Sequence, residues 1–206
     1  MFDLVLELQA IHRAASRRPG DTGELVCVQV RRSYPYAIAD VWSALTDPAR
    51  LARWMFPIEG SLRAGGSFQF QGNAGGDILA CEPPRLLRIS YGGPTSIVEI
   101  RLTAPGEGVT ALSLEHTVPI EIARSVAGAL FVGPGWDVGL VALGLHLQGS
   151  LADAAAFHKS RDVQDLGAGS VVAWATTAAA AGASDDEIAG LRQMALAHFA
   201  PDVPPS

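Results

Sequence analysis

Histidine is the residue of this sequence best suited to acid–base chemistry, and its five copies are scattered along the chain. No two of them have metal-ligand spacing, and Cys27 and Cys81 do not form a Cys-x-x-Cys motif. His116 is the most informative histidine, because strand alternation places it on the same face as Leu112 and Leu114. There it could orient a ligand carbonyl or act as a base, whereas the structural alternative is a histidine bonded to the backbone near a strand end. We expect no metal and no cofactor.

Other patterns that would indicate catalysis are missing from the sequence. The serines lack the Gly-x-Ser-x-Gly motif of hydrolases, and no lysine of a Walker-type phosphate loop follows the glycines at 65–76. Glu115 lies on the opposite strand face from His116, and Asp137 and His146 lie on different sides of a helix, so neither pair forms a dyad. The sequence therefore predicts no catalytic residues.

The element expected to position a site is a long helix over Gly133–Gly149, GPGWDVGLVALGLHLQG. It is apolar on two sides, and its two stripes are Trp136, Leu140, Leu143 and Leu147, and Val138, Val141 and Leu145. Such a helix needs cover from two directions, which a sheet and additional helices can supply. Gly139 and Gly144 weaken helix propensity, which suggests close approach by a neighbour or room for a ligand.

The remaining elements follow from hydrophobic period and turn residues. Residues 2–18 have the spacing of an amphipathic helix that ends at Pro19-Gly20. Alternation predicts a strand over 24–34, and two short helices follow, at 38–45 and 51–54. Short apolar segments separated by turns then indicate an antiparallel meander over 68–71, 77–81, 86–91, 97–102 and 109–117. Two further helices are expected over 170–181 and 184–199, the second opening with a capping box of Ser184 and Glu187.

Composition limits the classes of partner. The chain has 206 residues, a formal charge of −6 and 49% apolar residues, and it has no cluster of Lys and Arg that would indicate nucleic-acid binding. The N-terminus lacks the basic leader of a secretory signal, and no run approaches the roughly 20 apolar residues of a membrane span. The two cysteines are expected as buried thiols, although one disulfide remains an alternative. We expect a soluble, cytoplasmic protein; a homodimer is an open alternative to a monomer.

Four segments in order carry a family resemblance: IADVWSALTDPARLARWMFPIEGSLRAGGSF, GNAGGDILACEPPRLLRI, LSLEHT and GPGWDVGLVALGLHLQG. They resemble the START-like helix-grip (SRPBCC) superfamily, in the bacterial branch similar to the C-terminal domain of heat-shock ATPase activator homologues. The resemblance implies an α+β fold, in which a curved antiparallel sheet wraps around a long C-terminal helix. We expect an N-terminal helix at 1–20, the helix-grip domain at 21–150 and a helical extension packed on it at 151–206.

A helix grip encloses a cavity between its sheet and its long helix, so the resemblance implies binding of a small hydrophobic ligand, such as a polyketide or another natural product. Some superfamily members in enediyne producers act in biosynthesis or self-resistance, and transport is a further role. The alternatives are a polyketide cyclase or aromatase, with His116 assisting proton transfer, and a co-chaperone-like interaction module. The residues expected around a ligand are apolar and aromatic with one histidine: Trp54, Phe56, Phe68, Phe70, Tyr91, Leu112, Leu114, His116, Phe131, Trp136, Leu140 and Leu143.

Overall fold

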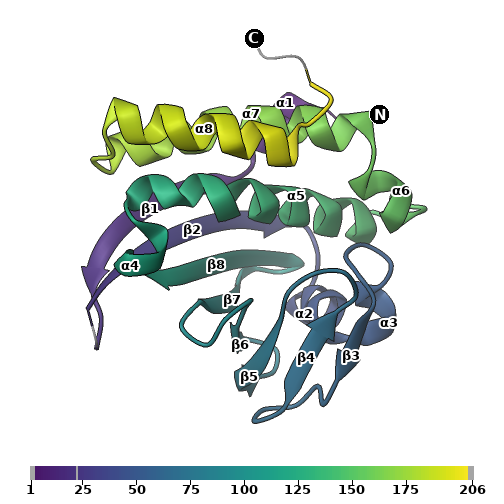
Figure 1. The fold of residues 1–206 in the computed structure, drawn as a ribbon. Helices are drawn as coiled ribbons and strands as arrows, with labels where there is room; N and C mark the ends of the chain where they lie inside the picture. The colour runs from purple at the N-terminus through teal and green to yellow at the C-terminus, as the bar shows by residue number, and fades with distance from the viewer. Residues whose placement is uncertain (1–2, 22, 204–206) are drawn as a thin grey trace. The chain divides into compact units, whose positions relative to one another are not determined.

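The computed structural model describes residues 3–21 and 23–203 as an α+β structure (Figure 1). In chain order its elements are α1 (Leu4–Gln9), β1 (His12–Pro19), β2 (Glu24–Tyr34), α2 (Ile38–Thr46), α3 (Pro48–Leu51), β3 (Ile58–Gly60), β4 (Ser67–Phe70), β5 (Gly75–Glu82), β6 (Leu86–Ser90), β7 (Ile97–Gly106), β8 (Val109–Pro119), α4 (Ile120–Ala123), η1 (Val126–Gly128), α5 (Ala129–Leu147), α6 (Ala154–His158), α7 (Arg161–Ala180) and α8 (Asp185–Phe199). The predicted helix-grip fold class is confirmed.

The chain forms two compact units. The terminal unit contains residues up to 30, 117–141 and from 156 onward, and the sheet unit contains 31–116 and 142–155. The predicted domain division at residues 20 and 150 stays a prediction.

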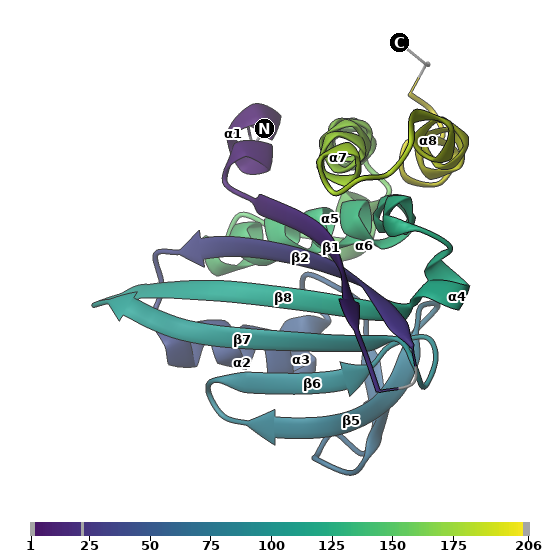
Figure 2. The same ribbon diagram turned by 90° about the vertical axis from the view of Figure 1, so that its left-hand side faces the viewer.

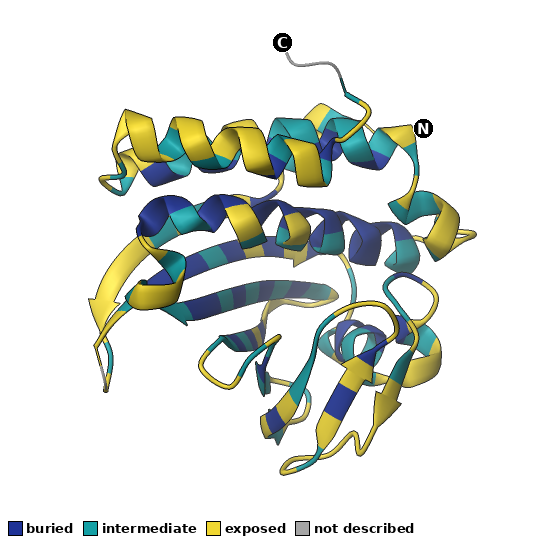
Figure 3. Ribbon diagram, in the orientation of Figure 1, coloured by how far each residue is buried: buried dark blue, intermediate teal, exposed yellow. Residues whose placement is uncertain are grey.

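The predicted meander is confirmed, because β4 to β8 are successive neighbours in an eight-stranded sheet of order β1-β2-β8-β7-β6-β5-β4-β3. The pairs from β3 to β7 are antiparallel, and Ile89 of β6 lies opposite Ile78 of β5 and Val98 of β7. Figure 2 shows β5, β6 and β7 running side by side. On β7 and β8, buried residues alternate with more exposed ones (Figure 3), as expected for strands with one face on a core. The short strand β3 was not predicted.

The prediction of one helix over residues 2–18 is wrong beyond Gln9. The helix α1 ends there, and residues 12–19 form the edge strand β1; residue 2 lies outside the described residues. Within β1, Arg13 and Ala15 are half-buried while their neighbours are exposed, which is the period of a strand. Pairing with β2 satisfies the backbone of this segment, so its tertiary setting overrides a helical spacing of apolar residues.

The long helix α5 begins four residues before the predicted start and carries Pro134 inside it. Its residues from Asp137 to Leu145 are buried except for Gly139, so both of its apolar sides are covered. One segment, Val126–Leu147, is long and apolar enough by length and composition to cross a membrane, and 67% of its most apolar window is buried inside the protein. That burial is typical of the core helix of a soluble α+β fold.

The C-terminal helices are more extensive than predicted. The weakly patterned stretch 150–169 contains α6 and the first turns of α7, while α8 has the predicted capping box between Ser184 and Glu187. Helices α7 and α8 pack side by side (Figures 1 and 2).

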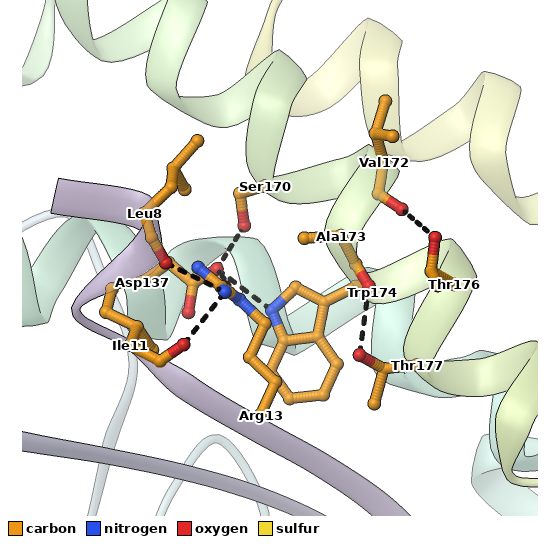
Figure 4. A network of polar contacts seen from close by, with 10 residues as sticks. All are labelled: Leu8, Ile11, Arg13, Asp137, Ser170, Val172, Ala173, Trp174, Thr176 and Thr177. Atoms are coloured by element: carbon orange, nitrogen blue, oxygen red, sulfur yellow. Dashed lines mark hydrogen bonds and ion pairs between the residues drawn. The ribbon is translucent and has the colours of Figure 1, made fainter. Parts of the chain in front are cut away.

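Asp137 joins three elements of the terminal unit through one carboxylate oxygen (Figure 4). Its Oδ2 accepts hydrogen bonds from Arg13 Nε at 2.8 Å, from Trp174 Nε1 at 3.1 Å and from the hydroxyl of Ser170. Arg13 Nη1 also donates to the carbonyls of Leu8 and Ile11, at 3.1 and 3.0 Å. The Asp137 side chain is 0% exposed. Strand β1, helix α5 and helix α7 are therefore tied together around a buried ion pair.

Burial raises the pKa of Asp137, while the Arg13 charge and the hydrogen bonds from Ser170, Arg13 and Trp174 act in the opposite direction. Among the described residues, no hydrogen-bond partner reaches Asp137 Oδ1 or Arg13 Nη2. The pair is thus only partly satisfied, and loss of either partner would leave a buried charge.

The glycines of α5 serve different purposes. A Cβ at Gly133 would overlap the indole ring of Trp174, and one at Gly144 would lie 3.2 Å from Arg32 Nη2. At Gly139, by contrast, apart from its chain neighbours and the adjacent backbone of α5, no described heavy atom lies within 4 Å of a Cβ in that position. Two of these glycines therefore permit close approach by a neighbour, and Gly139 borders open space.

We expect Asp137→Asn to lower the free energy of unfolding by about 3–5 kcal/mol, because it leaves the Arg13 charge without its buried partner. Urea denaturation would measure this loss. Asp40→Asn is the matched control, since Asp40 is 45% exposed and forms its ion pair with Arg50 at the protein surface. We expect this variant to change the free energy of unfolding by no more than about 1 kcal/mol. Equal losses in the two variants would contradict a central role for Asp137.

We expect Gly133→Ala to destabilise the protein by about 1–3 kcal/mol, because the added methyl group must displace Trp174. Gly139→Ala, in the same helix, should be neutral or stabilising by up to about 1 kcal/mol, since alanine favours the helix and meets no neighbour there. Thermal unfolding of the two variants compares them directly, and a stable Gly133→Ala protein would refute the close packing.

Candidate functional site

The sheet unit contains an apolar pocket between the α2–α3 segment and strands β3 to β6. Its non-protein space is about 510 Å³, including solvent at the open mouth. The cavity itself, measured as the space open to the centres of water-sized groups, is about 80 Å³, which is small beside the roughly 300–1,000 Å³ typical of small-molecule sites. The side chains that line it are Leu45, Thr46, Leu51, Ile58, Leu62, Phe68, Phe70, Ile78, Cys81, Leu87 and Ile89.

Strand β4 supplies the aromatic part of the wall. Its burial pattern alternates, so Phe68 and Phe70 point inward while Gln69 is exposed. The two rings meet edge to face, with centroids 5.4 Å apart and an interplanar angle of 71°. Together with Ile78 they form a core cluster, and partly buried side chains pack against it: Met55, Phe56, Ile58, Cys81, Leu87, Ile89 and Tyr91.

The pocket wall is uncharged. Its polar side chains are Thr46, whose hydroxyl donates to the Trp42 carbonyl at 2.8 Å, and Cys81. Burial raises the pKa of the Cys81 thiol, so this group is neutral at neutral pH. Both cysteines are thiols, Cys27 buried and Cys81 half-buried, and they form no disulfide. An apolar, neutral wall favours an uncharged apolar occupant.

His116 is buried on β8, with 3% exposure, on the same face as Leu112 and Leu114, as predicted. Its Nε2 lies 2.7 Å from Ser96 Oγ, and its ring meets the edge of Tyr91 with centroids 6.3 Å apart. Burial lowers the pKa of His116 to about 4. The imidazole is therefore neutral at pH 7 and is a hydrogen-bonding group rather than a proton carrier there.

The predicted ligand residues fall into several groups, and their role in binding stays a prediction. Phe68 and Phe70 line the pocket, with Phe56 and Tyr91 packed against them. Trp54 is buried and donates its indole N–H to the Ala44 carbonyl at 2.9 Å. Others of the sheet unit are buried: Leu112, Leu114, His116 and Leu143. The remaining three belong to the terminal unit: Phe131, which is 45% exposed, Trp136, which is half-buried, and Leu140, which is buried.

Several wall residues were not predicted. Leu45, Thr46 and Leu51 come from the α2–α3 segment, which the sequence offers no reason to place against a particular strand. On β6 there is a usable signal, because Leu87 and Ile89 alternate along the strand, whereas on β5 a register shift between Ile78 and Ala80 breaks the alternation. The sequence also contained a signal for Asp137, which is a lone acid in the middle of an apolar helix. Among residues 3–21 and 23–203, no group of His, Cys, Asp and Glu could hold a metal ion.

Protonation of His116 should make stability depend on pH. The folded state favours neutral imidazole, whereas an unfolded histidine takes up a proton near pH 6.5, so stability is lost as pH falls from about 6.5 through about 4. At about 1.4 kcal/mol per pKa unit, the loss amounts to about 3 kcal/mol.

We expect His116→Gln to lack this part of the pH dependence, because glutamine keeps a hydrogen-bonding group but does not titrate. Denaturant unfolding of both proteins between pH 7 and 4 measures the difference. Parallel stability curves over that range would show that His116 does not titrate with a lowered pKa.

Comparisons with known proteins agree with this fold. The model of the family described as activator of Hsp90 ATPase homolog 1-like protein matches residues 35–142. The crystal structure of CalU16 from Micromonospora echinospora is similar at 40% sequence identity and a TM-score of 0.64, over 83% of this chain and 99% of CalU16. Comparison with curated proteins finds no match.

Two other solved structures are more distant. DynU16, described as a protein in the dynemicin biosynthetic locus, is 26% identical with a TM-score of 0.53, over 65% of this chain and 49% of DynU16. EF2215 from Enterococcus faecalis shares the fold alone, at 12% identity and a TM-score of 0.53, over 92% of each chain. Since the family model spans more than half of this chain and CalU16 matches most of it, the chain belongs to the activator of Hsp90 ATPase homolog 1-like family, with its START-like helix-grip fold.

Proposed function

We propose that this protein binds a small apolar molecule, of the polyketide or a related natural-product class, in the pocket of the sheet unit. The observation that carries the proposal is the pocket wall, which is apolar, partly aromatic and without charge. The family resemblance adds a fold associated with ligand cavities, and DynU16, from a biosynthetic locus, points to natural products as the ligand class. The proposed location is the cytoplasm.

Burial of apolar surface would supply the binding free energy. At about 25 cal/mol per Å², a ligand that loses about 300 Å² of apolar surface to the wall gains about 7 kcal/mol before the entropic cost of association. After an association cost of at least about 4 kcal/mol, about 3 kcal/mol remains, which corresponds to millimolar affinity at best from apolar burial alone. Tighter binding requires polar contacts as well.

Binding is favoured over the cyclase alternative because His116 is a poor base at neutral pH, with a pKa lowered to about 4 by burial. The second candidate function is interaction with an Hsp90-type ATPase, which the family description favours. It predicts that the protein binds such an ATPase whether or not the pocket is filled.

Cys81 provides a direct test, because it lies in the pocket wall. We expect the neutral probe N-phenyl-1-naphthylamine to slow alkylation of Cys81 by N-ethylmaleimide about tenfold when present at ten times its Kd, since only the unoccupied protein reacts. Mass spectrometry of Cys27→Ala and Cys81→Ala variants assigns the modified thiol. The probe should also raise the free energy of unfolding by RT ln(1 + [L]/Kd).

A matched pair of substitutions shows whether the probe occupies this pocket. Ile89→Trp fills the space beside Phe68 and should weaken probe binding at least tenfold, whereas Leu79→Trp, at a residue 48% exposed on the neighbouring strand, should leave it unchanged. Binding that is insensitive to Ile89→Trp, or that leaves Cys81 unprotected, would refute the proposed site.

A further inference from the structure

A serine–histidine pair lies in the sheet unit, outside the residues that line the apolar pocket. Ser96 immediately precedes β7 and is half-buried, and its Oγ lies 2.7 Å from Nε2 of the buried His116 on β8. Of the two residues, Ser96 is the more exposed and His116 is buried, so we treat His116 as the support and Ser96 as the group that meets a ligand.

Tyr91 connects this pair to the pocket. Its backbone N–H donates to the Ser96 carbonyl at 2.8 Å, and its ring meets His116 edge to face at an interplanar angle of 83°. The same side chain packs against the cluster formed by Phe68, Phe70 and Ile78, all of which line the pocket. One side chain therefore bridges the apolar wall and the polar pair.

The chemistry of the pair suits an uncharged oxygen. A serine hydroxyl has one donor and two acceptor positions, so after its bond to His116 it can still bind another polar group. A ligand hydroxyl fits either direction of the Ser96–His116 bond, because it can both donate and accept. An ionised carboxylate would meet no opposite charge in the pocket wall, and its burial would be unfavourable.

We propose that the site selects uncharged ring compounds that carry a hydroxyl group, with the ring in the apolar pocket and the hydroxyl reaching past Tyr91, beyond the lining residues, to bind Ser96 Oγ. His116 is a positioning residue that holds the Ser96 hydroxyl in place. The inference rests on the proposed function, since it names the polar end of the same ligand.

Three probes of nearly equal size test the selection: naphthalene, 2-naphthol and 2-naphthoate, measured by displacement of N-phenyl-1-naphthylamine at neutral pH. Wild-type protein should bind 2-naphthol about tenfold more tightly than naphthalene, the effect of one net hydrogen bond. It should bind 2-naphthoate at least tenfold more weakly than 2-naphthol.

Ser96→Ala should abolish the preference for 2-naphthol while leaving the naphthalene Kd unchanged, which also shows that the variant is folded. Thr95→Val removes the neighbouring, exposed hydroxyl and should keep the full preference. His116→Phe should lose the preference, and His116→Gln should retain it, because an amide can still hold the Ser96 hydroxyl. A role of His116 in folding alone would lower the affinity for all three probes in parallel.

The outcomes separate the two proposals. If naphthalene and 2-naphthol bind equally well and protect Cys81, or if Ser96→Ala keeps the preference, the inference about Ser96 is wrong while the binding function stands. If neither probe protects Cys81 or displaces the fluorescent compound, the binding function itself is refuted.

Discussion

The packing of the terminal unit depends on Asp137, an acid at the centre of a helix that is otherwise apolar. Its burial is tolerable because Arg13, Ser170 and Trp174 all donate to the same oxygen. Each donor comes from a different position in the chain, so the interaction specifies how β1 and α7 are held on α5. A hydrophobic contact would stabilise these elements without fixing their register, whereas three directed bonds to one atom do fix it.

The same interaction explains why the N-terminal segment departs from its sequence pattern. Apolar spacing favours a helix through residue 15, but a helix would leave the backbone of 12–19 unpaired with β2, and the Arg13 guanidinium must reach a buried carboxylate. The local preference is worth a few tenths of a kcal/mol per residue, which is less than a buried charged hydrogen bond contributes. Tertiary structure therefore determines this segment.

The rest of the fold was predictable to the extent that it follows local periodicity. Alternation located β4 to β8 and the inward face that carries Phe68 and His116, and the capping residues located the start of α8. The pocket was predictable only in part. The aromatic residues of β4 could be identified, because apolar and polar residues alternate along that strand. Leu45 and Leu51 join them through tertiary packing of α2 and α3, for which the sequence contains no local signal.

The sheet unit separates two kinds of environment that a ligand site needs. Around Phe68 and Phe70 the wall has no charge and favours any apolar group of suitable size, so it discriminates little between related compounds. Near Tyr91, a buried imidazole and a half-buried hydroxyl form one short polar interaction, and each has its partner within the protein. A compound that reaches this point without a hydroxyl gains nothing there, while one with a carboxylate loses its hydration without compensation. Affinity would thus come from the apolar area of the pocket, and selectivity from a single hydroxyl beyond its lining, next to Tyr91.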